Sequence, residues 1–107
     1  MRLLLDECVP RPLKRDLASF GATHVTDAGW SGKRNGALIM LMVEAGFDTL
    51  LTVDRGMEFQ QNVMASGIGI IVVLTTANRL KELRPLVPQI ADALARVKPG
   101  QFVKVGG

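Results

Sequence analysis

The sequence has 107 residues and a mass of 11.6 kDa, a length that fits one domain over residues 1–107. Hydrophobic residues make up 48% and charged residues 21%, which is globular usage and excludes a disordered chain. The formal net charge of +3 permits a polyanionic partner without requiring one. The apolar runs are too short to span a membrane, and the single cysteine excludes a disulfide framework, so a cytoplasmic location is expected.

The first half of the chain alternates between predicted strands and predicted helices. In chain order these are a strand over 2–6, a helix over 10–20, a strand over 23–26, a glycine-rich loop over 29–36 and a helix over 36–45. Pro10 and Pro12 suit the first turn of a helix, where a missing N–H is tolerated. Asn35 is the predicted N-cap residue of the later helix, and Gly46 is its predicted end.

The second half continues the alternation. Its predicted elements are a strand over 49–53, a turn over 54–56, a short helix over 57–65, a strand over 69–74, a helix over 79–97 and an edge strand over 101–105. Pro85 and Pro88 are expected to split the long helix. Strands separated by helices favour right-handed crossovers. The predicted fold is therefore a three-layer α/β/α sandwich around a mostly parallel sheet of four to five strands.

Acidic residues follow two of the predicted strands. Asp6 and Glu7 follow the first strand, and Asp54 follows the third, so parallel strands would bring them to one edge of the sheet. Like charges gathered together are costly unless a cation joins them, and hard oxygen ligands favour Mg²⁺ or Mn²⁺. The sequence predicts that Asp6 and Asp54 hold this ion, and that Glu7 and Asn35 assist.

Basic and amide side chains are predicted around the same edge. They are Arg11, Lys33, Arg34, Arg55, Gln61, Asn78 and Arg79. Cations around a metal site suit phosphodiester hydrolysis, because they hold phosphates while the metal activates water. The competing interpretation is structural, since an aspartate after a strand often caps a turn or a helix without any chemistry.

Several segments of the chain resemble, in the same order, a short prokaryotic PIN-like family: residues 4–11, 29–36, 51–55, 60–62 and 78–80. The resemblance implies a PIN-like fold and kinship with metal-dependent ribonucleases, some of which are toxins of toxin–antitoxin pairs. Position by position, Asp6 matches the first-strand metal acid and Asp54 the acid after the third strand. The pair Asn35-Gly36 stands where relatives often carry acidic residues, so this chain lacks one carboxylate that many PIN nucleases use.

Three functions stay open at this point. The first is a Mg²⁺- or Mn²⁺-dependent ribonuclease, with RNA as substrate and, in a toxin setting, an antitoxin protein covering the site. The second is a catalytically silent PIN-like subunit that binds a partner or a nucleic acid. The third is a receiver-type phosphoacceptor, whose order of residues is imitated by Asp6, Glu7, Asp54, Thr75 or Thr76, and Lys104. Methionine- and leucine-rich helix faces favour a homodimer, and no membrane partner is expected.

Overall fold

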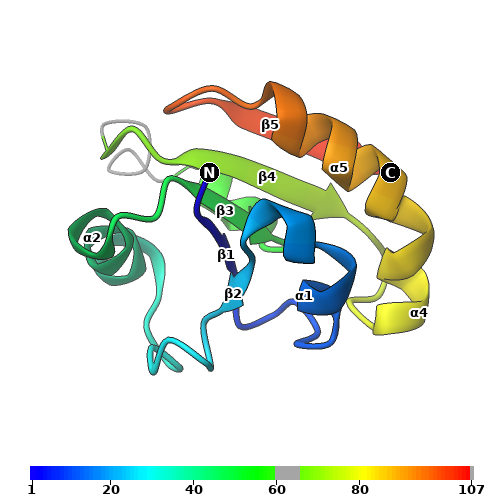
Figure 1. Cartoon of the computed structure of the whole chain (residues 1–107), viewed down its shortest axis with the longest axis horizontal. Helices are drawn as coiled ribbons and strands as arrows, with labels where there is room; N and C mark the ends of the chain where they lie inside the picture. Colours follow the sequence, from blue (N-terminus) through cyan, green and yellow to red (C-terminus); the bar gives the residue numbers. More distant parts are fainter. Residues whose placement is uncertain (60–65, 107) are drawn as a thin grey trace.

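One parallel sheet organises the protein. The computed structural model describes residues 1–59 and 66–106, and within these ranges the sheet has five strands in the order β2-β1-β3-β4-β5. The strands are β1 (Leu3–Leu5), β2 (Thr23–His24), β3 (Thr49–Thr52), β4 (Gly69–Leu74) and β5 (Phe102–Gly106). Every neighbouring pair is parallel, which confirms the predicted α/β class (Figure 1).

Helices cover both faces of this sheet. In chain order the helical segments are α1 (Leu13–Asp16), the 3₁₀ helix η1 (Ala18–Phe20), α2 (Asn35–Ala45), η2 (Arg55–Phe59), α4 (Leu80–Leu83), η3 (Arg84–Leu86) and α5 (Val87–Arg96). Figure 1 shows α1, α4 and α5 on one side of the sheet and α2 on the other. In the described part of the chain, no helix is long and apolar enough to cross a membrane.

The leucines of β1 show how the two cores form. Successive side chains of a strand point to opposite faces, and all three leucines of β1 are fully buried. Leu3 and Leu5 join the core beneath α1 and α5, whereas Leu4 joins the core beneath α2. Each buried leucine contributes about 1.5–3 kcal/mol relative to an exposed one. The interior strand β1 is therefore fixed by helices on both faces of the sheet, which holds the residues after it in place.

The strand order creates a switch point beside β1. The chain leaves β1 to form β2 on one side and then crosses to form β3 on the other side. At such a reversal the connections leave in opposite directions and open a crevice at the carboxyl ends of the strands. Asp6 follows β1 and Asp54 follows β3, so both predicted metal ligands lie where this crevice opens.

The predicted helix over 10–20 is wrong in part. Instead the structure has the single turn of α1 followed by η1, with Leu17 between them at φ −115°. The hydrogen bonds of this first turn run over three residues, as from the Leu13 N–H to the Pro10 carbonyl at 3.0 Å, which is the 3₁₀ pattern. The predicted split of the long helix at the two prolines is confirmed by η3 between α4 and α5.

Two further boundaries differ from the sequence prediction. Helix α2 begins at Asn35, so Arg34 and not Asn35 is its N-cap residue, and no side chain caps that end. Gly46 ends the helix as predicted, at a φ of 83° that suits glycine. The predicted turn over 54–56 lies partly within η2, and most of the predicted helix over 57–65 falls outside the described residues.

Candidate metal and phosphate site

A cleft of about 470 Å³ opens at the switch point between β1 and β3. Its lining combines acidic, basic and apolar side chains: Asp6, Glu7, Cys8, Gly32, Lys33, Arg34, Leu38, Asp54 and Met57. The acids come from the loops after β1 and β3, and the basic residues come from the loop that leads into α2. The structure therefore brings both predicted metal ligands into one cleft.

Asp6 is held by hydrogen bonds to both oxygens of its carboxylate. The Thr52 hydroxyl donates to Oδ2 at 2.7 Å, and the Glu7 N–H donates to Oδ1 at 2.8 Å. The Asp6 N–H donates to the Leu51 carbonyl at 2.9 Å, which extends the pairing of β1 with β3. Since each carboxylate oxygen has two lone pairs, Asp6 keeps acceptor capacity for a cation.

Asp54 is oriented by the turn in which it lies. Its Oδ1 accepts the Gly56 N–H at 2.8 Å, and its own N–H donates to the Thr52 hydroxyl at 3.0 Å. This is the turn-capping geometry that is expected if Asp54 has only a structural role. The same geometry leaves the exposed carboxylate at the cleft, so the capping role and a metal-binding role are compatible.

Thr52 joins the two aspartates and was not among the predicted site residues. Its side chain is fully buried, and its hydroxyl both donates to Asp6 and accepts from the Asp54 N–H. A buried hydroxyl between two strands costs free energy unless it is bonded, and here both partners belong to the cleft. The signal in the sequence was the spacing Thr-x-Asp at the end of an otherwise apolar strand.

Glu7 makes a contact that the sequence analysis did not predict. Its Oε1 accepts the Gly32 N–H at 2.7 Å, so it ties the loop after β1 to the loop that carries Lys33 and Arg34. A carboxylate engaged in this way holds the basic loop over the cleft. Glu7 therefore lines the cleft, and its bond to Gly32 positions the neighbouring loop.

The cleft gathers charges of both signs beside a protonated thiol. Lys33 and Arg34 line the same cleft as the two aspartates, and their charges suit a phosphate group. Burial raises the pKa of the Cys8 thiol, and the neighbouring Asp6 carboxylate raises it further. Cys8 is therefore uncharged at neutral pH and is no nucleophile or soft metal ligand in this state.

The other predicted phosphate-binding residues whose side chains the structure describes are not part of the cleft lining. Arg11 pairs with Asp27, which also binds Lys14 at 2.9 Å, and Arg79 pairs with Glu82 at 2.7 Å. The Asn78 side chain donates to the Cys8 carbonyl at 2.8 Å, so it fixes the loop after β1. Arg55 is exposed at the start of η2. Gln61 lies outside the described residues, and the same holds for the side chain of Asn35.

The receiver-type arrangement is not assembled around this cleft. Lys104 lies on β5 and lines a separate groove along α5, and it is absent from the cleft that holds Asp54. The Thr75 hydroxyl donates to the Ala77 carbonyl at 2.7 Å within its own loop. A phosphoacceptor needs its hydroxyl and lysine beside the acceptor aspartate, and neither residue lines the cleft.

The donor set of the cleft fits an open magnesium or manganese site. Among the described residues, no group of three histidine, cysteine or acidic side chains is arranged to hold a metal ion. Magnesium, however, keeps several of its waters and is commonly bound through one or two carboxylates together with substrate phosphates. The two aspartates supply that hard, oxygen-based chemistry, and the protonated Cys8 thiol adds no soft ligand beside them.

Comparisons of the chain with protein-family models, with curated proteins and with solved structures found no match.

Proposed function

We propose that this protein is a PIN-like, Mg²⁺- or Mn²⁺-dependent ribonuclease that hydrolyses RNA phosphodiester bonds. The observation that carries the proposal is a single cleft that is lined by Asp6 and Asp54, which are joined through Thr52, and by Lys33 and Arg34. When bound, the metal ion would supply an activated water and neutralise charge on the phosphate. The sequence motifs that resemble PIN-like proteins favour RNA as the substrate.

In this proposal, different residues of the chain bind the metal ion, bind the RNA phosphates and position the basic loop. Asp6 and Asp54 hold the cation, and Thr52 keeps the Asp6 carboxylate turned toward the cleft. Lys33 and Arg34 bind the phosphates on either side of the scissile bond. Glu7 holds the loop that carries these two cations, through its bond to the Gly32 N–H. Substrate is thus positioned by one loop and metal by two strand ends.

A toxin role in a toxin–antitoxin pair is the biological setting that the resemblance favours. An antitoxin protein would then inhibit by covering the cleft and by placing its own charged groups against Lys33 and Arg34. The single cysteine is compatible with the reducing cytoplasm, where cellular RNA is the substrate.

The decisive experiment is cleavage of a fluorogenic single-stranded RNA with Mg²⁺ or Mn²⁺. We expect metal-dependent cleavage that chelation abolishes, and a loss of at least about 100-fold in Asp6→Asn, because one carboxylate cannot retain the ion in place. The matched control is Asp92→Asn, an exposed acid on α5 that pairs with Arg96 at 3.2 Å and should keep full activity. Equal activity of Asp6→Asn and the unaltered protein would refute the proposal.

A silent binding subunit is the second candidate. It is favoured by the engagement of Glu7 with Gly32 and by Asn35-Gly36 in place of an acidic pair, which leave two carboxylates for the metal. Isothermal titration with Mn²⁺ separates the candidates. Binding that is lost in both Asp6→Asn and Asp54→Asn supports the nuclease, whereas no binding at millimolar Mn²⁺ supports the silent subunit.

A further inference from the structure

Helix α2 is apolar on two opposite sides. Its sequence, NGALIMLMVEA, contains one charged residue, Glu44. Leu38 and Met42 pack on the sheet, and they are almost completely buried. On the opposite side Met40 is 65% exposed and Val43 is 50% exposed. A helix that is apolar all round is normally covered on all sides, so this outer face calls for a partner.

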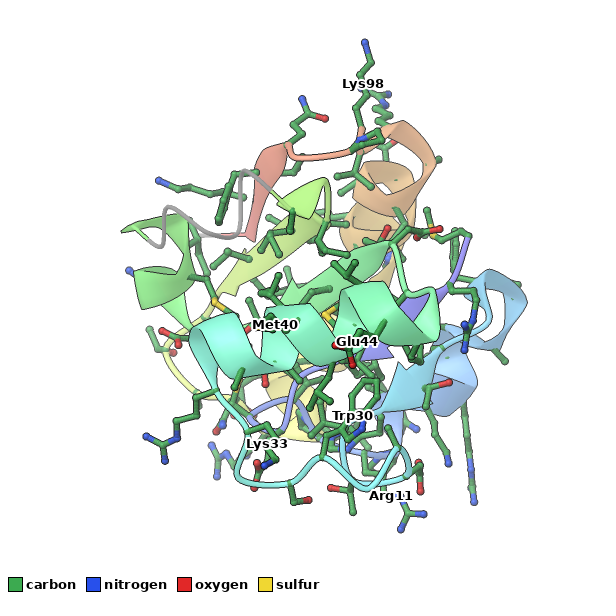
Figure 2. The ribbon with its side chains drawn as sticks, turned by 90° about the vertical axis from the view of Figure 1, so that its left-hand side faces the viewer. Arg11, Trp30, Lys33, Met40, Glu44 and Lys98 are labelled. Atoms are coloured by element: carbon green, nitrogen blue, oxygen red, sulfur yellow. The ribbon has the colours of Figure 1, made fainter. Side chains whose placement is uncertain are left out.

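The outer face forms a continuous groove along the helix. It is lined by Gly36, Ile39, Met40, Val43, Glu44 and Ser66. The α2 residues recur at spacings of three and four, which places them in one stripe. Figure 2 shows Met40 and Glu44 on α2 at the front of the molecule, with Lys33 on the loop before the helix. The groove is distinct from the cleft, because none of the residues that the structure describes lines both.

We infer that this face binds a second copy of the chain, with the two α2 helices antiparallel across a two-fold axis. Met40 is the middle residue of α2, which runs from Asn35 to Ala45, so it would meet its counterpart at the axis. The same symmetry places Val43 against Gly36 and Ala37 of the other helix. A large side chain then faces small ones on both sides of the axis, which lets the helices approach closely.

Charge complementarity favours the same arrangement. In the antiparallel pair, Glu44 lies against the N-terminal end of the other α2 helix. That end carries partial positive charge, has no side-chain cap and directly follows Lys33 and Arg34. The contact occurs twice by symmetry. A parallel pair would instead set the two Glu44 carboxylates side by side, which is unfavourable.

The contact is short, so the dimer should be weak. An 11-residue helix is about 16 Å long, and one helix pair buries less than the roughly 800 Å² per partner of a standard interface. Sedimentation velocity from about 5 to about 500 µM should therefore show a monomer that converts to a dimer as concentration rises. This association needs neither metal nor RNA, so its failure and the failure of the nuclease proposal are separate results.

Substitutions on the outer face should weaken the dimer without unfolding the domain. Met40→Lys places two like charges at the axis, and we expect dimerisation to weaken by at least about tenfold. Glu44→Lys should weaken it by a smaller factor, since it faces a positive helix end. Ala95→Lys, which adds the same charge to an exposed position of α5, should leave the dimer unchanged. Circular dichroism and thermal unfolding would verify that all variants fold.

A cross-linking experiment tests the geometry itself. In a Cys8→Ser background, Met40→Cys should form an intermolecular disulfide on mild oxidation, because a residue at a two-fold axis meets its own copy. Ala95→Cys should not. A monomer at every concentration would overturn the inference. So would a dimer that Met40→Lys leaves intact or in which Met40→Cys fails to cross-link, because the helices would then not meet at this residue.

Discussion

Polar residues follow β1, β3 and β4, but only those after β1 and β3 meet in the cleft. Asp6 and Asp54 lie at the reversal of strand order, where the connections diverge. The polar residues after β4, by contrast, do not line the cleft. Thr75 bonds with Ala77, Asn78 with the Cys8 carbonyl, and Arg79 with Glu82. A polar residue beyond a parallel strand is therefore a site candidate chiefly when it borders the switch point.

The largest effect should come from the two aspartates taken together. If both hold one ion, Asp6→Asn and Asp54→Asn should each reduce kcat/KM for RNA by at least about 100-fold. The double variant should then lose little more than either single variant, because residues that act as a unit are not additive. Initial rates at saturating Mn²⁺ provide the measurement. Losses that multiply in the double variant would mean that the aspartates act independently.

The next largest effect should come from the Thr52 hydroxyl, which joins the two aspartates. Thr52→Val keeps the shape of the side chain and removes its bonds to Asp6 and to the Asp54 N–H. We expect destabilisation of about 1–2 kcal/mol in urea unfolding, and a fall in kcat of about tenfold as the Asp6 carboxylate loses its orientation. Thr49→Val, at a buried threonine at the other end of β3, is the matched control and should leave kcat unchanged. An unchanged kcat in Thr52→Val would remove Thr52 from the site.

A smaller effect, on KM for RNA, should distinguish the basic residues that line the cleft from Arg79, which follows β4. Lys33→Ala or Arg34→Ala should raise KM for RNA about tenfold, since each removes one phosphate contact from the cleft. Arg79→Ala breaks only a surface ion pair with Glu82 and should change KM less than twofold. Salt titration of KM would show a shallower slope in the first two variants alone. Equal changes in KM for all three variants would contradict the distinction between the cleft and the loop after β4.

The smallest effect concerns stability at low pH. Hydrogen bonds from Arg11 and Lys14 lower the pKa of Asp27 from its ordinary 3.8 to about 2. Because the folded-state pKa is the lower one, this interaction stabilises the fold above about pH 4 and is lost as pH falls toward 2. Urea midpoints of the unaltered protein and Asp27→Asn should therefore differ slightly at pH 6 and converge near pH 2. If the two urea midpoints still differed at pH 2, the difference would not come from the ionised Asp27 carboxylate.

The sequence predicted the strands more accurately than the helices. The strand over 69–74 was placed at its observed bounds, because its continuous β-branched run leaves no alternative. The first helix was overestimated, since helical spacing alone does not reveal that the segment breaks at Leu17 into two short pieces. The parallel class followed from the alternation of elements, but the strand order that makes the switch point required the structure.

The residues of the cleft were predicted only in part, because some of their contacts, like the strand order, cannot be read from the sequence. Asp6, Asp54, Lys33 and Arg34 follow from their positions next to predicted strands and helices, and all four line it. Whether a charged side chain turns into the cleft or pairs elsewhere depends on contacts distant in the sequence. Arg11 shows this, because its partner Asp27 comes from the loop after β2. Thr52 was missed because a threonine inside a strand is ordinarily a packing residue.

The most direct test is a crystal structure of the protein soaked in Mn²⁺, with anomalous diffraction used to locate the ion. We expect a peak in the cleft within bonding distance of the carboxylates of both Asp6 and Asp54, and no such peak in Asp6→Asn crystals. An ordered cleft without a peak at millimolar Mn²⁺, or a peak bound by neither aspartate, would contradict it.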